Sequence, residues 1–377
     1  IVPPRAFRGG MSFVSAHTHL PPDCLAAMMR EAPVLADPAA AATRLDLALE
    51  SLPERAELGA LLDANPCVRQ VLLGIAEGSP FLLELIRFDP GRLMRALRAP
   101  PVQRVAELAA LCAREVRAAE GEAAAMSALR RMRAEAALVI ALADIGGALD
   151  LMSVTRALSD IADSAVSLAL DFLLREAAGS GKLVPPDPDR ISHGCGLAII
   201  AMGKHGAREL NYSSDVDLIV VYDRDATSLA PGVEPAPFFV RLTKALVRLL
   251  QERTGDGYVL RVDLRLRPDP GSTQVALSTL AALDYYEREG ATWERAAYIK
   301  ARPVAGDREV GRAFLSDLSP FVWRRILDFQ AIADVHAMKR EIHAFRGHDV
   351  VAVEGHNVKL GRGGIREIEF FVQTQQL

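Results

Sequence analysis

The chain has 377 residues, of which 50% are hydrophobic and 24% charged, and its formal net charge is −4. These values are ordinary for a globular protein of two or three domains, and they give no support for general nucleic-acid binding, although a local basic groove stays open. No apolar run approaches the roughly 18 residues that would span a bilayer.

The cysteines of the chain are widely scattered, and no two of them have the CxxC spacing of a zinc or redox motif. They are Cys24, Cys67, Cys112 and Cys195. We therefore expect neither structural zinc nor a disulfide framework, and a reducing cytoplasm is the expected location.

Helical features dominate the first half of the chain. Residues 1–19 lack the apolar core of a signal peptide and are expected to be a disordered lead or a remnant of cloning. Residues 20–190 are rich in Ala, Leu, Arg and Glu and predict an N-terminal helical domain, a bundle rather than a repeat array. Helix starts are indicated where an N-cap residue precedes a proline, at Asn65-Pro66, Ser79-Pro80 and Asp89-Pro90. Longer helices are predicted at 101–119, 122–146 and 151–178.

The pattern changes after the Gly/Pro-rich segment 179–190, which is the clearest domain boundary. Apolar runs bounded by turn residues predict strands at 196–203, 216–223 and 258–268, with a helix at 237–254 between the last two. Helices dominate again from about 277, and a glycine-rich turn within 356–371 enters a last helix that has no stop signal, as expected for a fragment of a longer protein. We assign 191–320 to a catalytic domain and 321–377 to a C-terminal helical segment. The expected fold class is α+β, a mainly helical chain with an embedded mixed β-sheet domain.

Asp215 and Asp217 stand one residue apart at the start of a segment that reads as a buried strand, "DVDLIVVYD". Burying two close carboxylates is costly unless they have a partner. Because side chains alternate across a strand, both can reach one divalent ion or an adjacent pair. Magnesium is a hard cation that binds one or two carboxylates together with phosphate oxygens. Asp263, in "RVDLRLR", completes a metal-binding triad if its strand lies beside the first, and two ions could then clamp an in-line displacement at phosphorus.

Groups suited to a phosphate surround these acids in the sequence. Gly203 ends the first strand and allows close approach of the backbone, and Lys204 adds a positive charge. Ser213 and Ser214, directly before the aspartates, offer hydroxyl and N–H donors. A lone DxD is a weak signal, whereas the ordered set of glycine turn, DxD strand and later acidic strand is a strong one.

Four stretches resemble the bacterial glutamine synthetase adenylyltransferase/adenylyl-removing family of the nucleotidyltransferase superfamily. They are "AMGKHGARELNYSSDVDLIVVYD", "RVDLRLRPDPGS", "YYEREGATWERAAYIKARPVAGD" and "NVKLGRGGIREIEFFVQ". The resemblance implies a nucleotidyltransferase-type sheet domain, and it extends from roughly residue 70 to the end. It implies catalysis and metal ligation by Asp215, Asp217 and Asp263, with one or two Mg²⁺ ions. It also implies contacts to nucleotide or phosphate from Arg265, Arg267, Lys300 and Arg302, and to an anion from the turn around Lys359 and Arg362.

The resemblance further implies a reaction and partners. That family carries two nucleotidyltransferase domains in one chain, and a single motif set behind a long helical stretch resembles its N-terminal, adenylyl-removing half. The implied reaction is phosphorolysis of an AMP–tyrosine bond, with phosphate and AMP-tyrosyl protein as substrates and ADP as product. Glutamine synthetase, a PII-type signal protein and glutamine as effector are the implied partners, and neither nucleic acid nor membrane is expected.

Other functions stay open. The same site could transfer adenylyl groups from ATP to glutamine synthetase, because both reactions displace at the α-phosphorus. A nucleotidyltransferase for RNA ends or small molecules is a second alternative, although RNA binding would call for a basic stripe with stacking aromatics, and aromatics are only 6%. A nucleotide-sensing module without turnover is a third, against which the intact acidic triad argues. The arginines of "RLRP", Lys300 and Arg302 could equally be structural, and at least one of Glu367 and Glu369 is expected to be a salt-bridge partner.

Overall fold

The computed structural model describes residues 20–225, 227–323, 354–359 and 361–377. The chain divides into two compact units, Ile1–Pro101 with Ile145–Ala148, and Val102–Asp144 with Leu149–Leu377. The expected lead at 1–19 lies outside the described residues, as does most of the expected C-terminal helical segment, from 324 to 353.

The described part of the first unit is helical. Prolines start its helices as predicted: α4 begins at Pro66 and α5 at Pro80, where the Ser79 hydroxyl accepts the Leu82 N–H at 3.4 Å. The third predicted start is displaced by one residue, because Pro90 itself precedes the helix. The helices are α1 (Leu25–Met28), α2 (Pro38–Ala48), α3 (Arg55–Ala64), α4 (Pro66–Gly78), α5 (Pro80–Phe88) and α6 (Gly91–Arg98).

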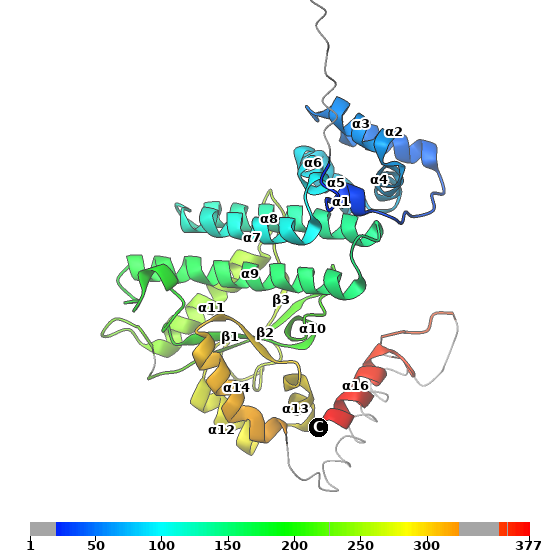
Figure 1. The fold of residues 1–377 in the computed structure, drawn as a ribbon. Helices are drawn as coiled ribbons and strands as arrows, with labels where there is room; N and C mark the ends of the chain where they lie inside the picture. The colour runs from blue at the N-terminus through cyan, green and yellow to red at the C-terminus, as the bar shows by residue number, and fades with distance from the viewer. Residues whose placement is uncertain (1–19, 226, 324–353, 360) are drawn as a thin grey trace, which may run out of the picture. The chain divides into compact units, whose positions relative to one another are not determined.

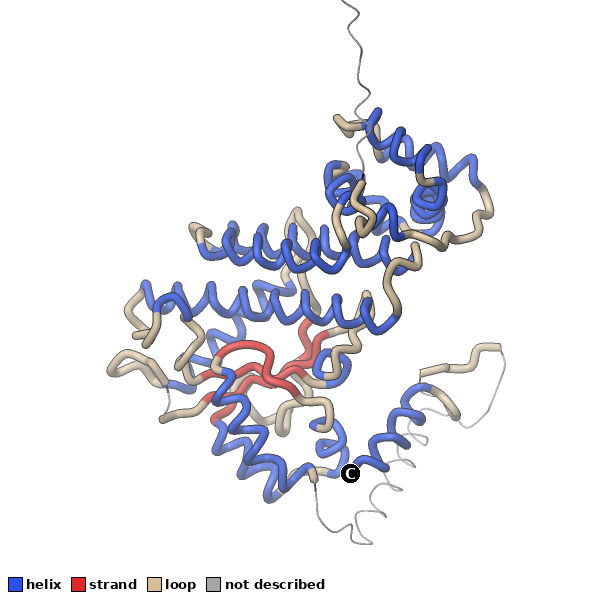
Figure 2. Tube along the Cα trace, viewed as in Figure 1, coloured by secondary structure: helices blue, strands red, loops and turns tan. Residues whose placement is uncertain are grey.

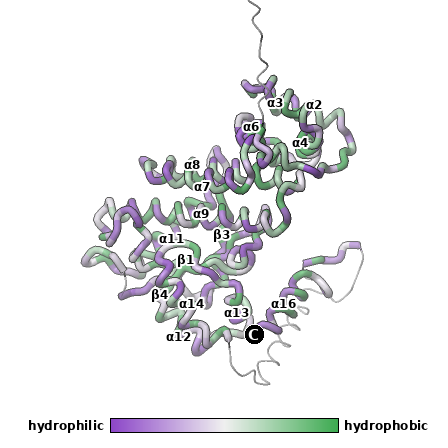
Figure 3. Tube along the Cα trace, viewed as in Figure 1, coloured by the Kyte–Doolittle hydropathy of each residue, from purple (hydrophilic) through white to green (hydrophobic). Residues whose placement is uncertain are grey.

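Three long helices of the second unit precede the sheet in the chain. They are α7 (Pro101–Arg117), α8 (Glu122–Ile145) and α9 (Leu151–Gly179), and each agrees with its predicted range to within two residues. Their hydrophobic and hydrophilic residues alternate along each helix (Figure 3), which is the pattern that predicted them. Among the described residues, no helix is both long and apolar enough to cross a membrane.

A mixed sheet forms the centre of the second unit (Figure 2). Its strands are β1 (Leu197–Ala201), β2 (Val216–Tyr222), β3 (Val262–Asp263), β4 (Leu277–Ser278) and β5 (Arg302–Gly306). The order is β3-β2-β1-β5, with β4 also paired to β2. β1 runs antiparallel to β2 and β5, whereas β3 and β4 run parallel to β2. The predicted α+β class is therefore confirmed.

Helices cover both faces of this sheet (Figure 1). On one face, alternate residues of β1 and β2 such as Ile200 and Ile219 form a core with Tyr286, Tyr298 and Phe314. These aromatics come from α12 (Thr279–Arg288), α13 (Thr292–Tyr298) and α14 (Arg308–Val322). On the other face lie α9 and α11 (Pro235–Gln251). The remaining helices are α10 (Gly203–Gly206), after β1, and α16 (Ile365–Gln376), which follows the predicted glycine-rich turn.

Two sequence predictions for the sheet were wrong. The strand predicted at 258–268 is only two residues long, β3, because Arg267 folds the following chain into a loop. Its guanidinium donates to the carbonyl oxygens of Leu264, Pro270, Thr273 and Gln274 at 2.8–3.2 Å. In addition, β5 was missed in a region predicted as helical. Pro303 within it weakens any strand signal, and the strand holds its place through pairing with β1.

The sheet shares its compact unit with helices from the expected N-terminal helical domain. Arg130 on α8 is buried, at 1% exposure, and donates to backbone carbonyls at the end of α11 and beyond it. Its acceptors include Gly257 at 2.9 Å, Leu249 at 3.2 Å and Glu252. A buried guanidinium needs such partners, so α8 and α11 are held together by polar contacts as well as by packing.

Candidate active site

Two acids lie side by side where β2 pairs with β3. Asp217 on β2 is in register with Asp263 on β3, so their side chains occupy neighbouring positions on one face. Burial, together with the neighbouring carboxylates of Asp263 and Asp215, raises the pKa of Asp217 to about 6. The pair thus concentrates negative charge that the surrounding protein only partly offsets.

Two arginines on the β3 segment neutralise Asp215 and Asp263. Asp215 directly precedes β2, and its carboxylate accepts from Arg261 Nε at 2.5 Å. Asp263 accepts from Arg265, with Nη2 at 2.5 Å and Nε at 2.9 Å from Oδ2. This hydrogen bonding lowers the pKa of Asp263 despite its partial burial. Arg265 therefore lies beside the acidic pair, and its charge also lowers the pKa of Asp217, whereas Arg261 is paired with Asp215.

The glycine turn predicted at Gly203 lies against Asp217. Gly203 has φ +53°, and a Cβ there would lie 2.8 Å from Asp217 Oδ2, so only glycine fits without displacing the carboxylate. The Met202 N–H also donates to the Asp217 carbonyl at 2.9 Å. The side chain of Lys204 is exposed, and it has no polar partner within the described ranges.

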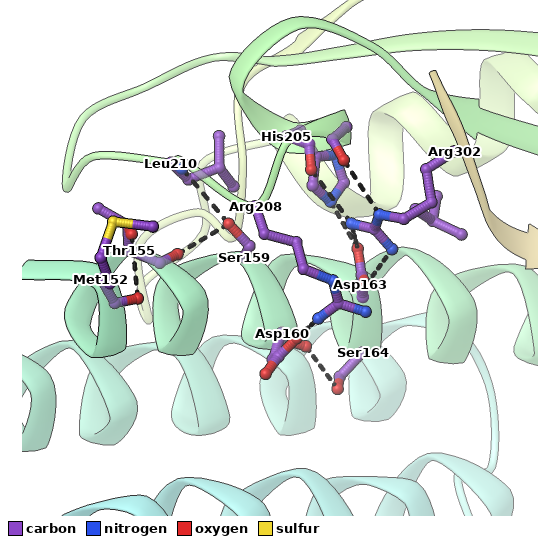
Figure 4. Close-up of polar contacts among 12 residues, drawn as sticks. Met152, Thr155, Ser159, Asp160, Asp163, Ser164, His205, Arg208, Leu210 and Arg302 are labelled. Carbon is purple, nitrogen blue, oxygen red and sulfur yellow. Dashed lines mark hydrogen bonds and ion pairs between the residues drawn. The ribbon is translucent and has the colours of Figure 1, made fainter. Parts of the chain in front are cut away.

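Behind the turn, α10 is anchored to α9 and β5 by a buried polar cluster of Asp163, His205 and Arg302 (Figure 4). Asp163 on α9 contacts His205 Nε2 at 2.7 Å and accepts two bonds from Arg302, at 2.6 and 3.1 Å. Arg302 also donates to the carbonyls of Gly206 and His205, at 3.2 and 3.1 Å. Burial opposes ionisation of Asp163, but the bonds from His205 and Arg302 outweigh it and lower its pKa. Arg302, predicted to contact the nucleotide, is thus engaged within the protein.

Other predicted site residues also have internal partners. Arg267 holds the loop after β3, as described above. Ser214 caps a turn, since its Oγ accepts the Asn211 N–H at 3.1 Å, and the Ser213 carbonyl accepts from Arg261 Nη2 at 2.5 Å. Lys300 forms ion pairs with Glu209 at 3.0 Å and with Glu369 of α16 at 3.5 Å, which agrees with the salt-bridge role expected for one of the two acids on that helix.

The glycine-rich segment before α16 brings one more cation toward the acids. Lys359 lies close enough to Asp217 for its charge to counter the rise in the pKa of that carboxyl. Glu367 accepts the Gly363 N–H at 2.6 Å and so closes the turn at the start of the helix. Of the basic residues predicted to meet an anion, Arg265 and Lys359 are those that the structure places beside the acidic pair.

The donor set suits a hard divalent cation. Asp215, Asp217 and Asp263 supply only carboxylate oxygens, and the pKa of Asp217 is raised by burial and by its two acidic neighbours, so a cation there would stabilise its charged form. Within the described residues, no three Asp, Glu, His or Cys side chains converge closely enough to hold a metal ion. Arg261 and Arg265 occupy two of the three carboxylates, so a metal ion would have to replace one or both as counter-ion.

The sequence analysis missed Arg261, Asp163 and His205. Arg261 stands two residues before Asp263 in the same stretch as Arg265, and that spacing could have indicated it. Asp163 lies 42 residues before His205 within a long amphipathic helix, and no local pattern distinguishes it.

Adjacent acids on a mixed sheet, with a glycine turn against one of them, fit the nucleotidyltransferase class that the motifs resemble. A family model described as glutamate-ammonia ligase adenylyltransferase matches residues 69–317, and a GlnD PII-uridylyltransferase model matches residues 334–377. The chain belongs to the glutamate-ammonia ligase adenylyltransferase family, which confirms the resemblance.

Curated relatives agree with this assignment. A protein of Xanthobacter autotrophicus is 70% identical over 94% of this chain, one of Bradyrhizobium sp. (strain ORS 278) 64% over 83%, and one of Rhodopseudomonas palustris (strain CGA009) 58% over 97%. Each is named bifunctional glutamine synthetase adenylyltransferase/adenylyl-removing enzyme. The chain spans only 32–37% of the length of these relatives.

Proposed function

We propose that this chain removes AMP from adenylylated glutamine synthetase by metal-dependent phosphorolysis. The observation that carries the proposal is the pair Asp217 and Asp263, in register on adjacent strands with Gly203 against one of them. We take glutamine synthetase as the substrate from the names of the relatives. The removing direction comes from the resemblance of the motif set to the N-terminal half of the family.

The reaction requires one bond to form and one to break at the same phosphorus. An oxygen of inorganic phosphate attacks the phosphorus of the AMP–tyrosine diester, and the new P–O bond makes ADP. The bond from phosphorus to the tyrosine oxygen breaks, and that oxygen takes up a proton. Tyrosine has an ordinary pKa of about 10 and is a reasonable leaving group once its developing charge is countered.

Specific side chains fit these tasks. Asp217 and Asp263, with Asp215, would hold one or two Mg²⁺ ions, which when bound polarise the phosphoryl oxygens and offset the developing charge. Arg261 and Arg265, once displaced from the carboxylates, would face the phosphate groups of the substrates with bidentate guanidiniums. Gly203 leaves room for a phosphate to approach the backbone, and the exposed Lys204 adds positive charge.

The partners belong to the same proposal. Glutamine synthetase is the protein substrate, and a PII-type signal protein and glutamine are the expected regulators in the cytoplasm. The match of residues 334–377 to a PII-uridylyltransferase model supports a connection to PII signalling.

Incubation with adenylylated glutamine synthetase, Mg²⁺ and phosphate, followed by nucleotide chromatography, tests the proposal. ADP that forms only with phosphate supports phosphorolysis, whereas AMP as product would indicate hydrolysis. A parallel incubation of ATP with unmodified glutamine synthetase tests the alternative, and AMP incorporation with pyrophosphate release would reverse the assigned direction. Asp215→Asn should abolish ADP release, and the matched control Asp284→Asn, at an exposed pair with Arg288 on α12, should not.

A further inference from the structure

The buried cluster of Asp163, His205 and Arg302 joins three elements through one carboxylate. Asp163 belongs to α9, His205 to α10 and Arg302 to β5, and the side chains of His205 and Arg302 both contact the Asp163 carboxylate, at 2.6–3.1 Å. The side chains of His205, Asp163 and Arg302 are 0%, 16% and 21% exposed. Charge-assisted bonds in such a dry setting are strong and directional, so they determine where α10 lies.

The hydrogen bonds of the cluster also select the tautomer of His205. Its Nδ1 is buried and has no hydrogen-bond partner among the described residues, whereas Nε2 is 2.7 Å from Asp163. A buried N–H without an acceptor would be costly, so the ring hydrogen belongs on Nε2 and is donated to Asp163. The ring therefore depends on that single carboxylate for its orientation.

The position of α10 directly affects the position of Asp217, because α10 is closely packed at both of its ends. At its C-terminal end, Gly206 is so close to the chain that a Cβ would lie 2.0 Å from the Lys300 carbonyl oxygen and 2.7 Å from that of Ala201. At its first residue, Gly203, an added Cβ would lie 2.8 Å from Asp217 Oδ2. Because both ends of α10 are closely packed, a displacement of α10 must move Asp217 or separate it from the turn.

We propose that Asp163 is a positioning residue for the nucleotidyl-transfer site, acting through His205 and Arg302 to hold the glycine turn against Asp217. The proposal rests on the proposed function for the reaction that it supports. It assigns a role at the site to a residue of α9, about three helical turns after the start of that helix at Leu151.

A neighbouring contact provides a matched control. Asp160, one turn earlier on α9, forms an ion pair with Arg208, but both side chains are 40–48% exposed and Arg208 follows α10. Exposed pairs contribute little, so Asp160→Asn changes the same helix face without loosening the turn. Leu174, fully buried on α9 far from the cluster, provides a second control, because Leu174→Ala lowers stability through a cavity alone.

The experiment compares Asp163→Asn with both controls in the full chain. We expect Asp163→Asn to lower kcat for ADP release by about 100-fold, with the KM for adenylylated glutamine synthetase unchanged within about 2-fold. Asp160→Asn should stay within about 3-fold of the wild-type kcat. Leu174→Ala should lower the melting temperature and leave kcat unchanged below that temperature. Where Asp163→Asn does not fold, His205→Gln, which keeps a donor but changes its position, replaces it and should lower kcat in the same way.

Binding of Mn²⁺, followed by electron paramagnetic resonance, gives a second readout that does not need turnover. Loss of a group that orients metal ligands from behind weakens metal binding by roughly 10–100-fold, and we expect Asp163→Asn to do so and Asp160→Asn not to. An inactive wild type with weakened Mn²⁺ binding in Asp163→Asn would overturn the proposed function and keep the positioning role for another nucleotidyl transfer. The positioning role is overturned if Asp163→Asn keeps both kcat and Mn²⁺ affinity, or if Leu174→Ala lowers kcat equally.

Discussion

Replacing Asp217 by Asn should stabilise the metal-free protein while it removes activity. The rise in the pKa of Asp217 from its ordinary 3.8 to about 6 means that the folded protein disfavours the charged carboxylate. This difference corresponds to about 3 kcal/mol between the two protonation states, an upper bound for a side chain that is not fully buried. The neutral amide escapes that cost, so the free energy of unfolding of Asp217→Asn should exceed that of the wild type by up to about 3 kcal/mol at about pH 8.

The sign of the pH dependence follows from the same shift. Below 3.8 the carboxyl is protonated in both the folded and the unfolded chain, and Asp217→Asn should bring no gain. As the pH rises from 3.8 through about 6, the folded wild type must give up a proton that it holds more tightly than the unfolded chain does, and it loses stability relative to the variant. Above that range the difference in the free energy of unfolding between Asp217→Asn and the wild type is constant.

Urea unfolding with EDTA, followed by tryptophan fluorescence, measures this difference. The two tryptophans of the chain, Trp293 and Trp323, both belong to the second unit and so report on the unit that contains the sheet. Saturating Mg²⁺ should reverse the order, because only the wild type keeps the ligand. Equal stability of the two proteins at about pH 8, or a pH-independent difference, would refute the electrostatic reasoning.

The remaining predictions concern the surroundings of the acids. Arg261→Gln should raise the affinity for Mn²⁺ severalfold in a spin-resonance titration, since Asp215 loses its competing cation; unchanged affinity would mean that the ion pair does not oppose the metal. Gly203→Ala should lower kcat by about 100-fold because its Cβ would lie 2.8 Å from the Asp217 carboxylate. Gly181→Ala, which has φ +71° and open space around it, is the matched control and should lower only the melting temperature; equal loss of kcat in both would point to backbone strain alone. Arg267→Met should lower stability by about 1–3 kcal/mol and leave Mn²⁺ affinity unchanged, since its partners are carbonyls of one loop.

Much of the sheet could be predicted from the sequence, because β1 and the part of β2 after Asp217 are apolar runs bounded by glycine or polar residues. Both strands are buried on both faces, and such strands carry their signal locally. The short strands β3, β4 and β5 carry no such signal. β3 and β4 have two residues each and β5 contains Pro303, and pairing with β1 or β2 decides their conformation.

The candidate site, like the sheet, was predictable only in part. The acids and Gly203 follow a motif order that is readable along the chain, and the structure brings Asp217, Asp263 and Gly203 together. The partners of charged residues could not be read in that way. The sequence does not distinguish the roles of the arginines at 261, 265, 267 and 302. Arg261 and Arg265 neutralise acids, Arg267 closes a loop and Arg302 connects β5 to α9. The fold decides these roles through the oxygen atoms that it places within reach of each guanidinium.

The buried guanidinium of Arg130 bears on how this protein can be dissected. A recombinant piece that begins at residue 191, where the strands start, would leave behind the donor for the carbonyls of Leu249, Glu252 and Gly257. Excision would expose those oxygens together with the apolar side of α11, and insolubility is the expected outcome. The minimal autonomous fragment should therefore start at α7, and chimeras between homologous enzymes should exchange the three long helices and the sheet as a single block.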